Sequence, residues 1–304
     1  MTDIELYLSQ FKNDEIFYFP NPGNAGDSLI AAATYQLFDK IGLTYHTPNI
    51  NYFNPSGKII MYGGGGNLTT PNSFSTKTVK KCHSSAKKLV ILPQTIRRND
   101  DLITELNSNV DIFCRELISY EYVKKISTNA NVYLANDMAF SFDLAEFNKT
   151  NIDYDPTKQL LKYITQKILR KKNAQSLNAI IRSFRVNNTI DEAISKSVPT
   201  QLNCLRIDGE KTNITLPNDN IDLSELFSYG VEDKLTSYMT IKTLFNFIER
   251  FDLVRTNRLH IAISCALLNK QVEFYSNNYY KNKAVYDFSI RGKYKNVYWC
   301  EDNA

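Results

Sequence analysis

Short apolar runs with high β-propensity recur along the first half of the chain, and helix-length segments separate them. The runs are 15–19, 58–62, 88–92, 110–114 and 131–135. A helical pattern from Asp27 to Phe38 follows the first run. Strands that alternate with helices are typical of parallel βαβ units, so this half predicts an α/β domain.

A second α/β series follows a stretch from 158 to 172 that is rich in Lys, Leu and Ile at helical spacing. Its predicted strands are 178–181, 204–207, 252–254 and 271–275, and its predicted helices are 236–250 and 260–268. The pattern therefore predicts a Rossmann-like domain over 1–150, a linker helix over 151–175 and a second Rossmann-like domain over 176–304. The linker pattern favours a solvated helix, and a basic face beside anionic lipid is the alternative.

Composition and charge narrow the class of protein. A chain of 304 residues is long enough for two domains, and 43% hydrophobic residues are typical of a globular protein. A net charge of +4 gives no reason to expect nucleic-acid binding. Five widely spaced cysteines show no metal-ligand spacing and favour a reducing compartment. Without a signal peptide or an apolar run of about 20 residues, we expect a cytoplasmic protein with no metal or cofactor.

Three candidate segments follow predicted strands directly. They are the glycine run that begins at Gly63, Arg182 after 178–181, and the segment 255–260. Doubly wound α/β domains bind ligands beyond the carboxyl ends of their strands. We therefore expect the three segments to line one cleft between the two domains.

The segment Arg255-Thr-Asn-Arg258-Leu-His260 carries the sharpest chemistry. It holds two arginines and one of only three histidines, between a predicted strand and a predicted helix. Arginine binds carboxylate or phosphate through two parallel hydrogen bonds, and histidine at a helix start can hold phosphate or transfer a proton. The pattern predicts an anion site, and a capping histidine beside surface arginines is the alternative.

Two glycine-rich turns are candidate substrate loops. Asn24 and Gly26 lie in a strand-to-helix turn, and Gly64, Gly65, Gly66 and Asn67 follow the second strand. Consecutive glycines cost backbone entropy and suit a close approach by a ligand or another backbone. No Lys-Ser or Lys-Thr pair follows, so the second turn is not a P-loop.

Further charged residues are predicted at strand ends. Arg182 and Arg185 can bring positive charge to the cleft or remain solvated. Glu116 and Asp137 can each act as a base, pair with an arginine or cap a helix.

Seven ordered segments resemble the polysaccharide pyruvyl transferase family. They are Asn24-Ala-Gly-Asp27, Gly63-Gly-Gly-Gly-Asn67, Leu92-Pro-Gln-Thr95, Cys114-Arg-Glu116 with Ser119, Asp137-Met-Ala-Phe140, Thr256-Asn-Arg-Leu-His260, and the stretch from Asn277 to Lys283. The resemblance implies a GT-B-like pair of Rossmann-like domains. It also implies transfer of pyruvate from phosphoenolpyruvate to two hydroxyls of a sugar, as a cyclic ketal.

By the same resemblance, specific residues are expected to act on the donor. Arg258, His260 and the backbone of Leu259 should contact phosphoenolpyruvate, together with Arg182. The residue pattern adds Arg185 and Arg255 as further donor-binding cations. His260 is the expected proton donor. Asp27, Glu116 and Asp137 are candidate bases for the sugar hydroxyls.

The resemblance further implies a surface-glycan precursor as acceptor, carried on lipid at the inner face of the cell membrane. One departure is that Asn257 stands where the family has Asp. Two other functions stay open: a GT-B glycosyltransferase that uses a nucleotide-sugar, and an inactive sugar-binding or scaffold protein of polysaccharide assembly.

Overall fold

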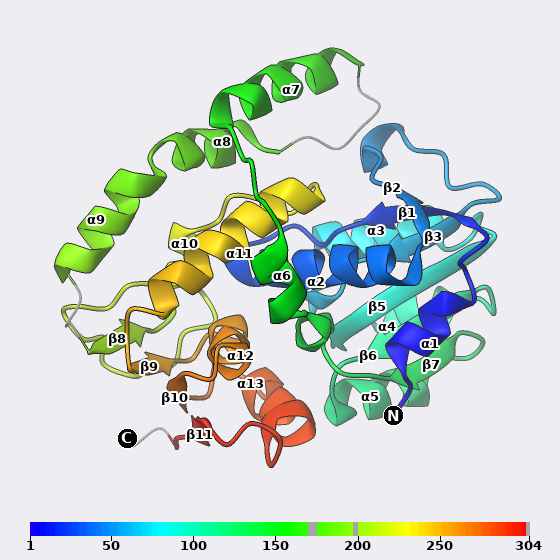
Figure 1. The fold of residues 1–304 in the computed structure, drawn as a ribbon. Helices are drawn as coiled ribbons and strands as arrows, with labels where there is room; N and C mark the ends of the chain where they lie inside the picture. Colours follow the sequence, from blue (N-terminus) through cyan, green and yellow to red (C-terminus); the bar gives the residue numbers. More distant parts are fainter. Residues whose placement is uncertain (170–174, 197–199, 302–304) are drawn as a thin grey trace.

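The computed structural model describes residues 1–169, 175–196 and 200–301. It is an α/β protein with two parallel sheets, shown in Figure 1. The larger sheet has seven strands, in the order β2-β1-β3-β5-β6-β7 with β4 paired to β5, and the smaller has the order β11-β10-β9-β8. Every strand pair in both sheets is parallel. The prediction of parallel βαβ units is therefore confirmed.

The first half builds the larger sheet. Its strands are β1 (Glu15–Phe19), β2 (Thr44–His46), β3 (Ile59–Tyr62), β4 (Gly65–Leu68), β5 (Lys88–Ile96), β6 (Val110–Cys114) and β7 (Asn131–Leu134). Its helices are α1 (Ile4–Ser9), α2 (Ala25–Ile41), η1 (Ile50–Tyr52), α3 (Phe74–Cys82), α4 (Asp100–Glu105), α5 (Leu117–Ile126), η2 (Met138–Ser141) and α6 (Leu144–Lys149). All five predicted strands are present. Part of the glycine run is strand β4 rather than a free loop.

The second half builds the smaller sheet. Its strands are β8 (Gln201–Cys204), β9 (Leu253–Thr256), β10 (Gln271–Phe274) and β11 (Val297–Trp299). Its helices are α7 (Pro156–Leu169), α8 (Leu177–Phe184), α9 (Val186–Lys196), α10 (Leu223–Leu226), α11 (Lys234–Ile248), α12 (Leu259–Leu267), α13 (Lys281–Val285) and η3 (Tyr286–Ile290). In the described part of the chain, no helix has the length and apolar character needed to cross a membrane.

The prediction of a strand over 178–181 is wrong, because this segment lies in α8. Ser176 caps the helix by accepting a hydrogen bond from the Ala179 amide, and Ala179, Ile180 and Ser183 are buried on one side. An apolar run of four residues suits a helix as well as a strand, and here the cap decides. The predicted linker helix corresponds to α7 as far as Leu169, and the stretch 170–174 lies outside the described residues.

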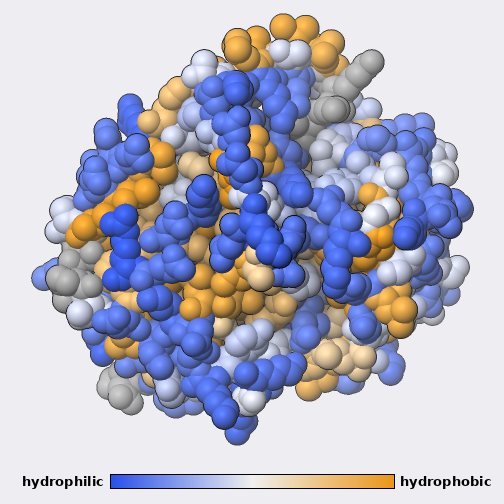
Figure 2. All heavy atoms as spheres, in the orientation of Figure 1, coloured by the Kyte–Doolittle hydropathy of each residue, from blue (hydrophilic) through white to orange (hydrophobic). Residues whose placement is uncertain are grey.

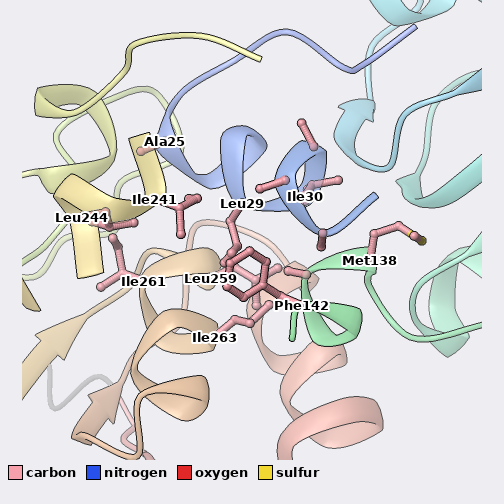
Figure 3. Packing of buried hydrophobic residues seen from close by; sticks show 14 of the residues in the cluster. Ala25, Leu29, Ile30, Met138, Phe142, Ile241, Leu244, Leu259, Ile261 and Ile263 are labelled. Carbon is pink, nitrogen blue, oxygen red and sulfur yellow. The ribbon is translucent and has the colours of Figure 1, made fainter. Parts of the chain in front are cut away.

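Each face of the larger sheet is covered by helices. Side chains that alternate along its strands pack on one face against α3, α4 and α5, and on the other against α2. The α2 side belongs to a cluster that continues into the second half through α11 and α12, as Leu29, Ile241 and Ile261 in Figure 3 illustrate. One continuous apolar core therefore joins the elements of both sheets.

This joint core gives a test of how the two halves are coupled. Leu29 is fully buried on α2, and the single Trp of the chain, Trp299, lies on β11 in the second half. We expect Leu29→Ala to lower the free energy of unfolding by about 2–5 kcal/mol. The Trp299 fluorescence should report this loss during urea denaturation, because α2 packs against the second half. An unchanged midpoint for Trp299 would show that the halves unfold as independent domains.

Candidate active site

A small polar cavity lies where segments from both halves of the chain meet. Its volume is about 100 Å³. Its lining, which we call the polar cavity, consists of Asn24, Asp27, Gly66, Asn67, Arg115, Arg206, Glu210, Ser224, Arg258, Leu259, His260 and Lys281. Four of these residues are permanent or potential cations, besides the histidine. The expected meeting of the Gly66–Asn67 turn with the segment 258–260 is therefore observed.

Helix starts and strand ends position these side chains. Arg115 directly follows β6, and Arg206 lies two residues after β8. Arg258 is the N-cap residue of α12, and its side chain does not cap the helix. Because Arg258, Leu259 and His260 line the cavity, the positive end of the α12 dipole lies beside it, which favours a bound anion.

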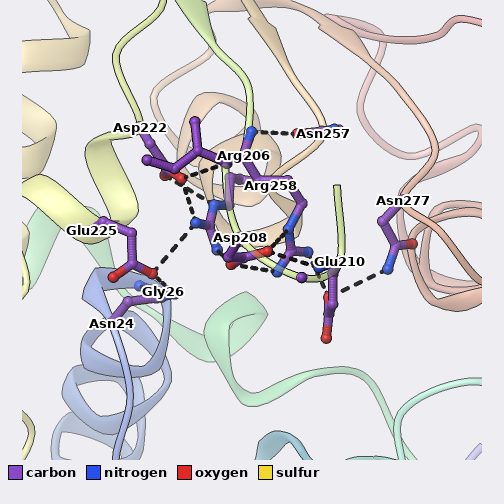
Figure 4. Close-up of polar contacts among 12 residues, drawn as sticks. Asn24, Gly26, Arg206, Asp208, Glu210, Asp222, Glu225, Asn257, Arg258 and Asn277 are labelled. Atoms are coloured by element: carbon purple, nitrogen blue, oxygen red, sulfur yellow. Dashed lines mark hydrogen bonds and ion pairs between the residues drawn. The ribbon is translucent and has the colours of Figure 1, made fainter. Parts of the chain in front are cut away.

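Arg258 is buried and already surrounded by carboxylates (Figure 4). Its Nε donates to Asp222 Oδ1 at 2.9 Å, its Nη1 lies 2.8 Å from Asp208 Oδ2, and its Nη2 lies 3.4 Å from Glu225 Oε1. Burial alone would lower the pKa of Arg258, but the hydrogen bond to Asp222 and its charge raise it. The guanidinium is thus charged and held in one orientation.

Glu210 takes a central position among the cations. Its Oε2 lies 2.6 Å from Arg206 Nη1 and 2.5 Å from Lys281 Nζ. The Asn277 amide donates to the same oxygen at 3.4 Å. Burial would raise the pKa of Glu210, but Lys281 and then Arg206 lower it below the ordinary value. An ionised carboxylate therefore bridges two of the cavity's cations.

Lys281 is the lysine of the polar cavity, and the pKa of its amine is lowered. Burial lowers its pKa to about 8, and the charge of Glu210 opposes this effect only in part. The amine is therefore partly neutral at moderately alkaline pH. Its charge depends on the anion beside it.

Asp137, Arg115 and His260 form a chain that ends at the cavity. Arg115 Nη1 donates to Asp137 Oδ2 at 2.6 Å, and His260 Nε2 lies 3.4 Å from the same oxygen. Burial would raise the pKa of Asp137, but Arg115 and then His260 hold it below the ordinary value. Asp137 lies behind the lining, in a position from which a carboxylate can orient a histidine ring.

Asp27 lies at the start of α2 and lines the cavity. Its Oδ2 accepts a hydrogen bond from the Asn24 amide at 3.0 Å, which completes a capping box with Asn24. Burial raises its pKa, and the charge of His260 opposes this effect. A carboxylate with a raised pKa is a stronger base than an ordinary aspartate.

The other glycines predicted as substrate loop have structural positions. A Cβ on Gly64 would lie 2.8 Å from the Pro93 carbonyl oxygen, and Gly65 has φ of 134° beside Asn21 and Asp27. A Cβ on Gly26 would lie 2.6 Å from His260 Nδ1. These glycines allow close packing around the cavity, while Gly66 and Asn67 line it.

Three of the predicted cations do not line the polar cavity. Arg182 and Arg185 are exposed at the end of α8, because the expected strand is a helix. Arg255 lies within β9, and its Nε pairs with Glu273 Oε2 on β10 at 2.6 Å. Glu116 is buried as the N-cap of α5, where it accepts from the Ser119 amide at 2.9 Å, and burial raises its pKa.

The sequence interpretation missed Arg115, Arg206 and Lys281. Arg115 follows a predicted strand directly, so the strand-end rule would have selected it. The predicted strand 204–207 contained Arg206, whereas the observed strand β8 ends at Cys204. Arg206 therefore follows the strand and was not recognised as a strand-end residue. Lys281 lies in the segment 277–283, whose resemblance to the family was noted without a role for the lysine.

Asn257, the departure from the family pattern, does not line the polar cavity. Its Oδ1 accepts a hydrogen bond from the Arg206 amide at 2.8 Å, and its own carbonyl accepts from Asn282 Nδ2 at 2.7 Å. The residue fixes the backbone that carries Arg206. Because Asn257 lies outside the lining, the change from aspartate to asparagine removes no acid from the polar cavity.

A second cavity shares part of this lining. Its volume is about 380 Å³, and it has Asn24, Asp27, Asn67, Arg206 and Glu210 in common with the polar cavity. Gly23, Asp208, Gly209, Glu225 and Ser228 complete its lining. We call it the adjoining cavity. The two together can hold a small anion next to a larger polar molecule.

Comparison with known proteins places this arrangement in a family. Residues 24–279 match the model of the polysaccharide pyruvyl transferases. The chain is 28% identical to "Putative pyruvyl transferase EpsO" of Bacillus subtilis (strain 168), over 92% of this chain and 87% of that protein. It also resembles the solved structure of the functionally uncharacterised protein KP1_0663 from Klebsiella pneumoniae subsp. pneumoniae NTUH-K2044. That likeness has a TM-score of 0.67 at 29% identity and covers 99% of each chain.

The close approach of α2 to His260 gives a direct test of the site geometry. We expect Gly26→Ala to displace the imidazole, because the new Cβ would lie 2.6 Å from Nδ1. The fold should survive by circular dichroism, while the His260 signals in a histidine NMR spectrum shift. Gly209→Ala is the control, since a Cβ there meets nothing within 4 Å. Unshifted His260 signals in the Gly26 variant would contradict the described packing.

Proposed function

Because the chain belongs to the polysaccharide pyruvyl transferase family, we propose that it transfers pyruvate from phosphoenolpyruvate to a sugar of a surface-glycan precursor as a cyclic ketal. The observation that carries the proposal is the set of four cations, Arg115, Arg206, Arg258 and Lys281, around a cavity of about 100 Å³. A small molecule with both a carboxylate and a phosphate suits this charge and this size.

The size of the polar cavity favours phosphoenolpyruvate over a nucleotide-sugar. Pockets for drug-sized ligands have roughly 300–1,000 Å³, which a nucleoside diphosphate sugar requires. The polar cavity holds about 100 Å³, whereas the adjoining cavity, with about 380 Å³, has room for a sugar ring. The arrangement supports a small donor beside a larger acceptor.

The polar cavity contains side chains that can transfer protons and bind anions, which supports an enzyme rather than an inactive scaffold. Asp27, His260 and Lys281 all lie in the lining. Asn257 holds the Arg206 backbone and lies outside the lining, so its identity does not remove a catalytic group. The scaffold alternative had rested on this substitution.

In the proposed reaction, two C–O bonds form at C2 of the enolpyruvyl group and the C2–O bond to phosphate breaks. One sugar hydroxyl adds to C2 while the methylene carbon gains a proton and becomes a methyl group. Phosphate leaves, and the second hydroxyl closes the ketal. Two hydroxyl protons are released, of which the methyl group takes one and phosphate or solvent takes the other, so no redox partner is needed.

The lining residues divide these tasks. Arg115, Lys281 and the first amides of α12 stabilise the phosphate as charge builds up on it, and Arg206 and Arg258 bind the carboxylate. His260, which Asp137 orients, is the proton donor to the methylene carbon. Asp27 lies between the two cavities and is the candidate base for the sugar hydroxyls.

Donor binding also requires Glu210 to move. Its carboxylate bridges Arg206 and Lys281, which are the cations that the donor needs. Glu210 lies on the segment between β8 and α10 and is about one-third exposed, so it has space to withdraw. A donor with stronger negative charge can then replace the carboxylate on both cations.

The acceptor is proposed to bind in the adjoining cavity. Asn24, Asn67 and Ser228 provide amide and hydroxyl groups of the kind that hydrogen-bond sugar hydroxyls. The acceptor is therefore expected to place two neighbouring hydroxyls near Asp27. A lipid-linked oligosaccharide made at the inner face of the membrane fits a donor that is available in the cytoplasm.

We predict that Lys281→Gln weakens the binding of phosphoenolpyruvate about 30-fold or more, because it removes a buried charge from the anion site. Isothermal titration calorimetry measures the effect. Lys283→Gln is the matched control, since Lys283 is partly exposed, pairs with Asp287 and does not line the polar cavity. Equal affinity in the Lys281 variant and the wild type would remove Lys281 from the donor site.

The pH dependence of donor binding follows from the same lysine. Its amine is charged below a pKa of about 8 and neutral above it, so affinity should fall by up to tenfold for each pH unit above 8. Lys281→Arg keeps its charge in this range and should remove the decline. A decline that persists in the arginine variant would assign the titration to another group.

We expect His260→Asn to reduce turnover by about 10²–10⁴-fold while the affinity for phosphoenolpyruvate changes only a few-fold. Asparagine keeps a polar side chain beside Asp137 but cannot donate a proton as an acid. Phosphate release with the cellular glycan precursor as acceptor measures turnover. Equal losses in binding and turnover would make His260 a binding residue rather than the acid.

A further inference from the structure

Helices α7 and α8 carry a group of large apolar side chains that the rest of the described chain does not cover. These residues, which we call the apolar strip, are Leu161, Ile164, Ile168, Leu169, Leu177, Ile181 and Phe184. Ile168 is 75% exposed and Leu161 is 63% exposed. Figure 2 shows apolar atoms at the surface over the α7 end of the molecule.

Helical spacing places the strip on one side of each helix. Leu161, Ile164 and Ile168 are separated by three and four residues, so their side chains share a face of α7. Leu177, Ile181 and Phe184 repeat the pattern on α8, whose opposite side buries Ala179 and Ile180. A helix on the surface of a globular protein normally turns its apolar face toward the core. On α7 and α8 the apolar strip instead faces away from the core.

The charged residues on the two helices themselves are all cations. No Asp or Glu occurs between 156 and 190. The described and exposed cations of this segment are Lys158, Lys162, Lys167, Arg182 and Arg185. Lys158 pairs with Asp153 and Lys162 with Asp233, whereas no acidic partner is recorded for the other three within the described residues.

We propose that α7 and α8 dock on an anionic lipid surface, with the apolar strip in the headgroup region and the cations at the level of the lipid phosphates. Exposed apolar residues flanked by Lys and Arg are typical of helices that lie in a membrane interface. A second copy of this chain fits less well. Two such surfaces face to face would bring together cations without any acidic residue between 156 and 190 to pair with them.

The docking surface lies next to the candidate site. Arg182 Nη1 lies 3.5 Å from the carbonyl oxygen of Ser228, and Ser228 lines the adjoining cavity. A lipid surface against α8 would therefore lie near the loop that carries Ser228, at the edge of the cavity proposed for the acceptor. This consequence rests on the proposed function, whereas membrane docking itself does not.

Co-sedimentation of the full chain with vesicles tests the proposal. Wild type should bind vesicles of phosphatidylcholine with 30% phosphatidylglycerol and bind pure phosphatidylcholine at least tenfold less, with the difference shrinking as salt is added. The double variant Ile164→Ser/Ile168→Ser should lose at least tenfold in partitioning. Leu6→Ser is the apolar control, because Leu6 is 74% exposed on α1, outside the strip.

Charge variants complete the test. Lys167→Gln/Arg185→Gln should weaken binding to anionic vesicles by about fivefold for each cation removed. The control Lys293→Gln/Lys295→Gln removes two exposed lysines elsewhere and should bind as wild type does. No binding of wild type, or equal binding by all variants, would overturn the proposal.

Light scattering on the same proteins distinguishes membrane docking from the binding of a second copy of the chain to the apolar strip. A wild-type dimer that Ile164→Ser/Ile168→Ser converts to a monomer, without vesicle binding by wild type, would assign the strip to a second copy and overturn membrane docking. Binding of phosphoenolpyruvate by the strip variants should equal that of wild type, since none of these residues lines the polar cavity. Vesicle docking and donor binding can therefore fail independently.

Discussion

The packing of α2 against α11 and α12 is the constraint on which the site depends. Leu29 on α2, Ile241 on α11 and Ile261 on α12 belong to one buried cluster. This contact brings the starts of α2 and α12 so close that Gly26 leaves no space for a Cβ beside His260. Asp27, His260 and the cations of two sheets share one small cavity because an apolar core fixes the helices that carry them.

Charge balance within the cavity shapes what it can bind. Arg258 contacts Asp222, Asp208 and Glu225, and Glu210 bridges Arg206 and Lys281. The inner carboxylates hold the guanidinium groups in place, as buried arginines require. Among these carboxylates Glu210 alone lines the polar cavity, whereas Asp208 and Glu225 line only the adjoining cavity.

The strands of the first half could be predicted from apolar runs. Ordered family motifs also pointed to Asp27, Arg258, Leu259 and His260, which line the polar cavity. It failed for Arg182, where a four-residue apolar run was compatible with either a strand or the capped helix α8. Arg206 was missed because a strand end was placed three residues late. Lys281 could not be recognised from periodicity. Its position in the cavity depends on contact with Glu210, which is 71 residues away in sequence.

A crystal structure of the protein with phosphoenolpyruvate tests the central claim most directly. The account predicts the ligand in the polar cavity, with its phosphate on Arg115 and Lys281, its carboxylate on Arg206 and Arg258, and Glu210 withdrawn from both of the cations that it bridges here. A ligand bound elsewhere, or a Glu210 that still bridges Arg206 and Lys281 in a fully occupied complex, would contradict it.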